Sequence, residues 1–486
     1  MAIKPFSVLV GAPTTKVIIT STERKTTLSA TLGDTEPQLL SVSTNKTLNQ
    51  PSGSFQISLT PEKDANGLTW FDKVNAWDFV EIYFKGILDK NEVTVMRGLI
   101  DSIAYSESFG SGAPQRNITL SGRDLGCLLT DFQIYIIPEL GPKAAAMAEL
   151  GGPIWFKAVQ EGFLYGNPYE IFKWLAEILF TEIDLQISTE EREHITTYFA
   201  WDAASFFPDM QTSMSFLASW QGTWWNTFSQ IQDQPFHELF IYDADELSYF
   251  IMRPTRLKDC YGNYHESVDS LIKDKSKSHM YPPDFKITNA EKISMSLSKS
   301  INDMRNFYLS FPTVNIIAKQ EFRGVAIQEN ADNPANSINP YLQLKEEFPS
   351  YMKKYGFRKY EFETVYLDLD IGQRKHQGVN FYDQTKDVFV EAGKKLNSVL
   401  ISWYLHNPLL LTGTVEIAGT NRAIVGTYML DEDEDKEYYV EGVSHSFTTL
   451  QSFTTGLTLS RGMPSKGLPG VNPKSFERKS SYEKRG

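Results

Sequence analysis

Cysteine and long apolar runs are scarce in this chain, and each shortage excludes a class of protein. Its 486 residues include two cysteines, Cys127 and Cys260, which lie far apart and form no CxxC motif. We therefore expect no disulfide framework, and folding in a reducing compartment fits this usage. The most apolar helical stretch, 171–180, contains Lys173 and Glu177 and is too short to span a bilayer. With no secretion signal visible at the N-terminus, we expect a soluble protein with no integral membrane association.

Positive charge is also in deficit. The chain has 47 Lys and Arg against 60 Asp and Glu, a formal net charge of -13. General nucleic-acid binding needs a basic stripe, so this class is disfavoured. An acidic surface would instead let DNA pass without adhering, because like charges repel.

Recognisable catalytic and metal-binding motifs are missing. The sequence has no HExxH or GxSxG, and no glycine-rich phosphate loop between a strand and a helix. The seven histidines are scattered without ligand spacing: His194, His237, His265, His279, His376, His406 and His445. We expect structural or surface roles for them, with His445 on a strand and facing solvent or a neighbouring subunit. The sequence thus predicts no catalytic, cofactor-binding or metal-binding residue, and no enzyme.

Three local features could carry chemistry, and each has a simpler interpretation. The acidic run Asp431–Asp435 offers oxygen ligands but lacks the spacing of an EF-hand loop, so we expect a solvated hairpin tip. The carboxylates of Glu238 and Asp243 could act as an acid and a base, but nothing places a sugar ring between them. The tryptophans in 220–225 could stack on a glycan or a base, whereas a helical core is the preferred interpretation.

Aromatic residues, by contrast, are abundant at 13% of the chain. Large rigid rings supply much of the burial in cores and at subunit interfaces. At this length we expect three or four domains, whose thick cores and permanent interfaces would use these rings.

A β pattern near the N-terminus returns near the C-terminus. The paired segments are 98–103 with 442–447, 118–121 with 457–460, and 80–82 with 415–417. Two related β units at opposite ends of one chain indicate a duplicated barrel or sandwich with other material inserted between the copies. Such a chain presents two similar surfaces to its neighbours, which suits a ring-forming assembly protein better than an enzyme.

Local patterns predict the other elements. Phe55, Ile57 and Leu59 alternate with polar residues, as in a half-buried strand. Pro168 follows Asn167, a good helix cap, and opens an amphipathic stripe. Further segments are expected as follows: a hairpin at 236–242 and 248–253, an exposed polar loop at 258–283, a strand at 293–297 that echoes 55–59, and a helix at 389–403.

Several of these segments, in their order along the chain, resemble the baseplate hub proteins of contractile-tailed phages and related injection particles, the late control protein D-like family. The matching segments are Gly122-Arg123-Asp124, Gln234-Pro235-Phe236-His237-Glu238-Leu239, Met252-Arg253-Pro254-Thr255, Tyr355-Gly356-Phe357-Arg358, Gly413-Thr414-Val415-Glu416-Ile417 and Tyr438-Tyr439-Val440-Glu441-Gly442-Val443. The resemblance spans roughly residues 40 to 462. The polar insertions 258–283 and 328–340 depart from the family's simplest forms.

The resemblance implies a structural baseplate hub. Such a protein forms a homotrimer in which each subunit carries two tube-like barrels, so the ring adapts a trimeric spike to a hexameric tail tube and nucleates tube assembly. The implied partners are the central spike protein, the tail tube protein, a tape-measure protein and baseplate wedge proteins, with DNA only as passing cargo. The implied location is the virion tail or injection-particle baseplate, assembled in the bacterial host cytoplasm.

The predicted fold class is α+β and predominantly β, with two tube-type β-barrel modules, an inserted helical domain and a small β-hairpin region. The expected boundaries are 1–135 for the first module, 136–234 for the helical Trp-rich domain, 235–284 for the hairpin and polar loop, 285–312 with 408–462 for the second module, 313–407 for a linker with an insertion and a long helix, and 463–486 for a flexible C-terminal arm. Two other functions stay open: a peptidoglycan-degrading tail hydrolase, and a receptor- or glycan-binding tail component.

Overall fold

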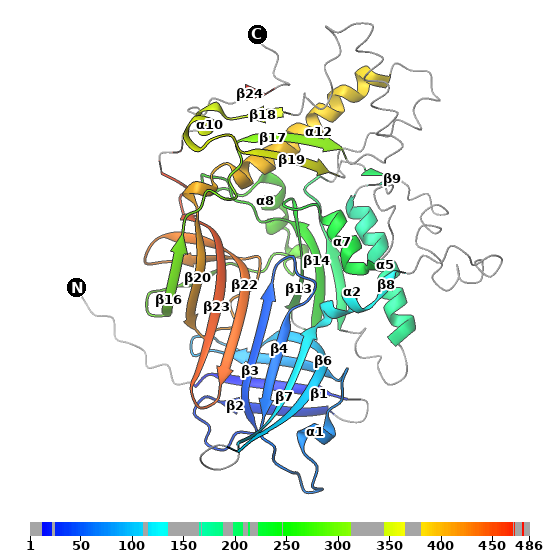
Figure 1. Ribbon diagram of the computed structural model, residues 1–486, viewed down its shortest axis with the longest axis vertical. Helices are drawn as coiled ribbons and strands as arrows, with labels where there is room; N and C mark the ends of the chain where they lie inside the picture. Colours follow the sequence, from blue (N-terminus) through cyan, green and yellow to red (C-terminus); the bar gives the residue numbers. More distant parts are fainter. Residues whose placement is uncertain are drawn as a thin grey trace, which may run out of the picture.

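A large curled antiparallel sheet dominates the protein, whose structure is a computed structural model (Figure 1). The structure describes residues 12–21, 25–109, 115–134, 165–166, 168–187, 198–207, 212–213, 222–244, 246–312, 345–364, 381–469, 471 and 479–480. Helices α5 and α7 lie at one side of the molecule, and a smaller mixed layer lies at the end opposite the N-terminal strands. The predominantly β fold class is confirmed.

The large sheet contains 13 of the described strands. Those from the N-terminal part are β1 (Thr14–Thr20), β2 (Lys25–Thr31), β3 (Leu39–Thr47), β4 (Ser54–Leu59), β5 (Phe79–Lys85), β6 (Val93–Ser108) and β7 (Gln115–Asp124). Those from the C-terminal part are β15 (Phe285–Ile287), β16 (Lys292–Ser298), β20 (Leu411–Ala418), β21 (Tyr428–Asp431), β22 (Lys436–Thr448) and β23 (Ser452–Pro464). We call these two sets the first and the second module.

Both modules have the same strand order. The first runs β3-β4-β7-β6-β5, and the second runs β16-β20-β23-β22-β21. Pairing of β22 with β3 joins them, so the strands of the two modules form one continuous sheet. The duplication is therefore real, but its copies share their hydrogen-bonded edges.

Alternation of apolar and polar residues places one face of this sheet in the core. In β4, Phe55, Ile57 and Leu59 are buried while the residues between them are more exposed, as the period of two predicts. The strand at 293–297 is β16, but it matches β3 in the strand order, whereas 55–59 matches β20.

A second core lies between α5 (Pro168–Ile187), α7 (Trp224–Gln232) and a three-stranded sheet. That sheet contains β10 (Phe199–Ala203), β13 (His237–Ala244) and β14 (Leu247–Pro254), and the last two are the predicted hairpin. The predicted stripe of α5 is buried, and Trp224 of α7 is fully buried, which agrees with a helical core. Asn167 and Trp220 lie outside the described residues.

The mixed layer has a four-stranded sheet of β17 (Phe307–Pro312), β18 (Lys345–Glu347), β19 (Lys359–Thr364) and β24 (Lys479–Ser480). It contacts α12 (Phe381–Tyr404), which contains the predicted helix 389–403. Because β24 pairs with β18, part of the expected C-terminal arm belongs to this sheet. The insertion 328–340 lies outside the described residues.

The expectation of an exposed loop at 258–283 is wrong. This segment contains α8 (Glu266–Lys273), which begins where the His265 side chain accepts a hydrogen bond from the Ser267 amide. The segment is mostly polar, but its apolar residues Val268 and Met280 are fully buried in the core that includes the strands of the second module.

The remaining short elements are α1 (Trp70–Lys73), α2 (Leu128–Asp131), α10 (Pro349–Tyr355), β8 (Gln133–Ile134), β9 (Tyr165–Gly166), β11 (Thr212–Ser213), β12 (Gly222–Thr223) and the 3-10 turns Leu125–Cys127, Lys275–Lys277 and Asn407–Leu409. Within the described ranges, the search for a bilayer-spanning helix found none.

Candidate assembly interface

The two modules match residue by residue, down to their irregularities. A β-bulge interrupts β6 at Asp101, and one interrupts β22 at Glu441 at the same place in the hairpin. A second pair of matching bulges lies at Leu40 in β3 and at Ile293 in β16. A β-bulge is a specific local feature of a strand pair, so bulges at equivalent positions show which residues of the two modules correspond.

The turns before β5 and β21, the strands that pair with the bulged strands β6 and β22, match as well. The amide of Trp77 donates to the carbonyl of Ile100 at 2.7 Å, and the amide of Gly426 donates to the carbonyl of Val440 at 2.8 Å. Both donors have left-handed backbones, with φ 73 at Trp77 and φ 72 at Gly426. A non-glycine residue rarely adopts this conformation, so Trp77 keeps a geometry that the fold of the module requires.

The repeat found in the sequence identified the right hairpins in the wrong register. The bulges make 98–103 equivalent to 438–443 and 118–121 equivalent to 455–458, shifts of four and two from the sequence prediction. In addition, 80–82 corresponds to 429–431, and 415–417 corresponds to 57–59. Even shifts preserve which residues face the core, so a pattern of period two cannot distinguish them.

The junction between the modules is a buried strand pair. The second half of β22 runs antiparallel to β3, with Phe447 opposite Val42 and His445 opposite Thr44. All four side chains are buried, and Phe447 also packs against Phe84, with ring centroids 6.4 Å apart. Backbone pairing and apolar burial thus act together at this seam.

Loops of the two modules lock the same seam at one end. Asp89, from the turn after β5, accepts hydrogen bonds from the Thr420 hydroxyl at 2.7 Å and the Asn421 amide at 2.8 Å. Gly86 and Gly419 bring their backbones together so closely that a Cβ on Gly86 would overlap the carbonyl of Gly419. The seam is therefore specific as well as apolar.

The first module lacks such a cover on the equivalent half-strand. Residues 102–108 of β6 pair with β7 on one side, and no described strand pairs with their other side. Tyr105, the counterpart of His445, is 45% exposed, whereas His445 is 5% exposed. At the far end of the sheet β16 pairs only with β20 among the described strands, and its Ile293 is 56% exposed. The outer half of β6 and the strand β16 are therefore two of the open edges in the described part of this sheet.

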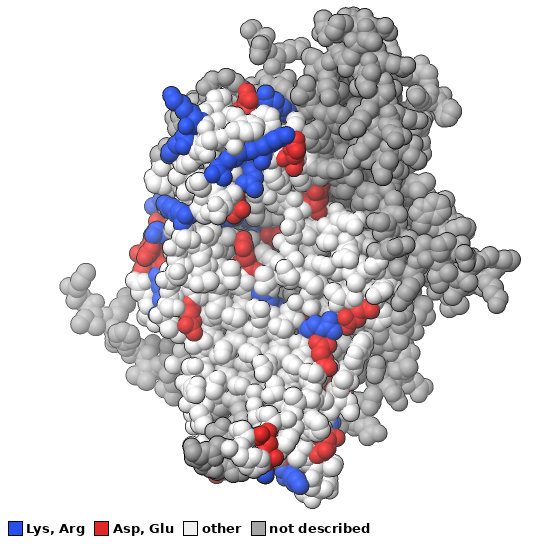
Figure 2. Space-filling view, in the orientation of Figure 1, with Lys and Arg blue, Asp and Glu red and all other residues white. Residues whose placement is uncertain are grey.

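The solvent face of the sheet is rich in small hydroxyl side chains and poor in charge. Registered neighbours on it include Ser41, Ser43, Gln56, Ser58, Thr119, Ser121, Ser294, Ser296, Ser298, Thr412, Thr414, Ser444, Ser446, Thr454 and Thr458. Charged members of this face include Arg123 and Glu416. Figure 2 shows few charged side chains on the surface over β3, β4 and β22.

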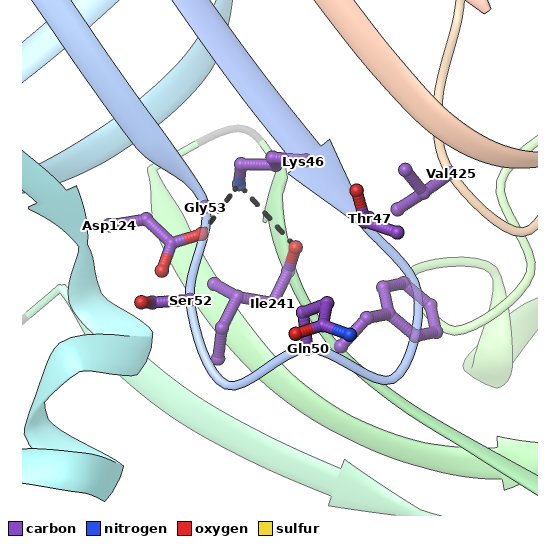
Figure 3. A pocket seen from close by; sticks show the side chains of 9 residues that line it. Lys46, Thr47, Gln50, Ser52, Gly53, Asp124, Ile241 and Val425 are labelled. Atoms are coloured by element: carbon purple, nitrogen blue, oxygen red, sulfur yellow. Dashed lines mark hydrogen bonds and ion pairs between the residues drawn. The ribbon is translucent and has the colours of Figure 1, made fainter. Parts of the chain in front are cut away.

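A buried cation lies beside the seam. Lys46 of β3 lies 3.6 Å from Asp124, and its ammonium donates to the carbonyl of Ile241 at 3.4 Å (Figure 3). It is also ion-paired with Asp243. Burial opposes the charge of Lys46, but the two carboxylates outweigh it and raise its pKa. Burial raises the pKa of Asp124 to about 6. One adjoining cavity holds about 10 Å³, room for one water, and the paired charges hold β3, β7 and β13 together.

The described histidines have structural partners. The partners are the Phe206 amide and the Gln232 carbonyl for His237, the Ser267 amide for His265, Asp202 for His279, Tyr351 for His406 and Thr455 for His445. Burial lowers the pKa of His237, His406 and His445 to about 4 in each case. The expectation that His445 faces solvent or a neighbour is wrong, because its ring is buried against Phe84 and Phe453 of the same chain. His194 and His376 lie outside the described residues.

The two carboxylates considered for acid–base chemistry are held apart by separate partners. Glu238 is paired with Arg253 at 3.0 Å and accepts a hydrogen bond from Tyr439, and burial raises its pKa. Asp243 is occupied by Lys46 and by the Ser248 hydroxyl. Both are parts of buried networks.

The other sequence candidates are also explained by structure. The acidic run Asp431–Asp435 spans the turn between β21 and β22, as predicted, and Asp431 is ion-paired with Lys292. Cys127 and Cys260 are free thiols. Among the residues that the structure describes, no group of three or more His, Cys, Asp or Glu side chains is placed to hold a metal ion.

Comparison with known proteins gives distant structural matches and no sequence match. No protein-family model and no curated protein matches the chain. A tail protein from Neisseria meningitidis matches at 14% identity over 92% of this chain and 96% of that one, with a TM-score of 0.45. The 43 kDa tail protein of prophage MuSo2 from Shewanella oneidensis matches at 10% identity over 93% and 99%, with a TM-score of 0.45. A prophage tail protein from Listeria monocytogenes matches at 10% identity over 91% and 94%, with a TM-score of 0.41.

Each of these three proteins is named as a tail protein. The similarity is too distant to assign a function by itself, so function has to be inferred from this chain's own geometry.

Proposed function

We propose that this protein is the structural hub of a contractile tail baseplate. In this proposal it forms a homotrimeric ring that joins a trimeric spike to a hexameric tail tube and nucleates tube assembly. Its work is assembly and force transmission, and it catalyses no reaction. The ring resides in the virion tail or in the baseplate of a related injection particle.

One observation carries the proposal: two modules of identical strand order, with matching bulges, lie side by side in one sheet. A chain built this way offers six similar modules from three copies. A six-fold tube and a three-fold spike can then bind one ring, because its six modules match the tube and its three chains match the spike. Head-to-tail contacts close into such a ring when the rotation between modules is right.

The sheet surface fits a channel lining. Hydroxyl side chains dominate its solvent face, and the chain as a whole carries a net charge of -13. A neutral wall in an acidic protein offers few cationic anchors to the phosphates of passing DNA. A tape-measure protein would meet the same wall before DNA passes.

The internal seam supports a permanent assembly. Its apolar strand pair and its Asp89 network resemble a folded core more than a transient contact. A hub has to move as a rigid body when the sheath contracts, so interfaces of this quality are required.

The mass of the complex in solution tests the proposal. Light scattering on the purified chain alone should give three times the chain mass of 55.2 kDa, and with the spike and tube proteins of the same particle it should give a heavier complex that contains three copies of the chain. A chain that stays monomeric alone and with both partners would exclude the hub. Clearing of purified peptidoglycan by the chain would favour the hydrolase alternative, and affinity for host surface polysaccharide would favour the glycan-binding one.

A further inference from the structure

We propose that the open half of β6, residues 102–108, binds β16 of a second copy of this chain as an antiparallel strand pair. The register is the one that β22 and β3 use inside the chain. This inference rests on the proposed ring, since a ring supplies each β6 with a neighbouring β16. It adds to that proposal the identity of the two edges and the residue pairs between them.

The internal duplication identifies the partner strand. Inside the chain, the half of β22 beyond its bulge binds β3. The half of β6 beyond its bulge is the counterpart of that half-strand, and β16 is the counterpart of β3. The first module therefore displays the binding edge, and the second module displays the strand that this edge binds. They lie at different places in one chain, so the contact has to form between copies.

Equivalence also sets the register. Transferring the β22–β3 pairs to their counterparts gives Ala104 opposite Ser298, Tyr105 opposite Leu297, Ser106 opposite Ser296, Glu107 opposite Met295 and Ser108 opposite Ser294 of the neighbouring copy. The bulges at Asp101 and Ile293 lie just outside these pairs, so both edges are regular along the whole contact.

The side chains on the outer face repeat the chemistry of the seam. Within the chain Ser446 lies opposite Ser43, and between copies Ser106 would lie opposite Ser296. Direct hydroxyl pairs of this kind favour cross-strand pairing. The outer face would thus continue across the contact as the same uncharged surface.

The side chains on the inner face supply the apolar part. Tyr105 is 45% exposed and already touches Phe71 of α1, with ring centroids 6.4 Å apart. Leu297 packs at the margin of its own chain's core and is partly exposed, and this exposed part would cover the open side of the Tyr105–Phe71 pair in the neighbour. Phe71 is itself 47% exposed, so the contact would bury apolar surface that the single chain leaves in water.

Each copy contributes one edge of each kind, so the contact is head-to-tail. Three internal seams and three contacts between copies would alternate around a closed trimer. The sheet would then have no open edge of this type, which removes the aggregation hazard of two exposed strand edges.

Cysteine cross-linking tests the register directly. In the full chain with Cys260→Ser, the double variant Ser106→Cys, Ser296→Cys should form disulfides between copies on mild oxidation. Denaturing gels without reductant should then show dimers and trimers. The matched control is Ser108→Cys, Ser298→Cys, which uses the same strands with each cysteine four positions from the other's predicted partner. That offset is about 13 Å along a strand, beyond disulfide reach, so no cross-link should form.

A second variant keeps the test independent of disulfide chemistry. Leu297→Asp should turn the trimer into a monomer by light scattering, whereas Ile301→Asp, an exposed position beyond β16, should leave it intact. Circular dichroism of both variants should match the parent chain.

The outcomes separate this inference from the hub itself. A trimer that cross-links only in the control, or that survives Leu297→Asp, would overturn the strand pairing and leave the hub standing. Cross-linked ladders longer than a trimer would support the pairing and contradict the closed trimer. A chain that never associates, alone or with spike and tube proteins, would overturn both.

Discussion

The second half of β22 and the second half of β6 have the same place in two copies of one module, yet one is core and the other is surface. Phe447 in β22 is fully buried, and its counterpart Glu107 in β6 is exposed. The backbone hydrogen bonds to the hairpin partner are the same in both copies. What differs is the neighbouring strand: β3 lies beside β22, and β6 has no such strand within the described part of the chain.

The comparison shows that burial here depends on what packs against a half-strand: Phe84 packs against both His445 and Phe447. The residue types at equivalent positions of the two half-strands differ accordingly. The covered edge has Val443, His445 and Phe447, and the open edge has Ile103, Tyr105 and Glu107. The open edge has two large apolar residues and one charged residue, as expected for a strand edge that the single chain leaves in contact with water.

The largest expected effect is at the seam itself. Phe447→Ala should lower the free energy of unfolding by about 4 kcal/mol, because it leaves a cavity among Phe84, Phe453 and Val42. Urea denaturation followed by tryptophan fluorescence measures this. Glu107→Ala, at the equivalent position, should change the stability of the single chain by about 0.5 kcal/mol or less. Equal losses at the two positions would contradict the distinction between a covered and an open edge.

The buried lysine gives the next contrast. Lys46→Met should cost about 3 kcal/mol at pH 7, because Asp124 and Asp243 would remain buried without their cation. The counterpart of Lys46 is Lys299, an exposed residue one position beyond β16. Lys299→Met should leave the urea midpoint unchanged. A tolerated Lys46→Met would mean that water reaches this ion pair.

The left-handed turn at Gly426, just before β21, sharpens the comparison further. A Cβ at Gly426 would overlap the guanidinium of Arg253, which donates to the Gly426 carbonyl at 2.6 Å and is ion-paired with Glu238. Gly426→Ala should therefore destabilise the chain by about 2 kcal/mol more than backbone strain alone. Gly356→Ala isolates that strain, since φ is 78 there and no atom lies near the added methyl. Similar thermal shifts for the two variants would show that Arg253 moves aside freely.

The smallest effect concerns pH and His445. Burial, with a contribution from Lys46, lowers its pKa to about 4 from an ordinary value of 6.5. Between these values the unfolded chain binds more protons than the folded one, so the free energy of unfolding falls as pH falls. His445→Gln should reduce the loss of stability between pH 7 and pH 5 by about 2 kcal/mol.

Tyr105→Gln, at the equivalent position of the open edge, is the control for this titration. It removes no group that titrates in this range, so the difference between the two pH values should stay as in the parent chain. A pH dependence unaffected by His445→Gln would show that the imidazole is hydrated in the folded state.

Much of the local structure could be predicted from the sequence. Alternation identified β4, helical spacing identified α5 and α12, and the hairpin of β13 and β14 was placed within a residue or two. The polar composition of 258–283 hid the few apolar residues that pull this segment into the core. The open and covered edges could not be distinguished, because both strands show the same alternation.

The sequence by itself determined that the chain is mainly β, that its two ends are related, and that it has no recognised catalytic motif, because periodicity and composition are properties of short segments. Only the tertiary structure decided the register of the duplication and the strand that covers β22. Residues 42 and 447 are brought together by the fold, and no local pattern encodes which distant edge meets which.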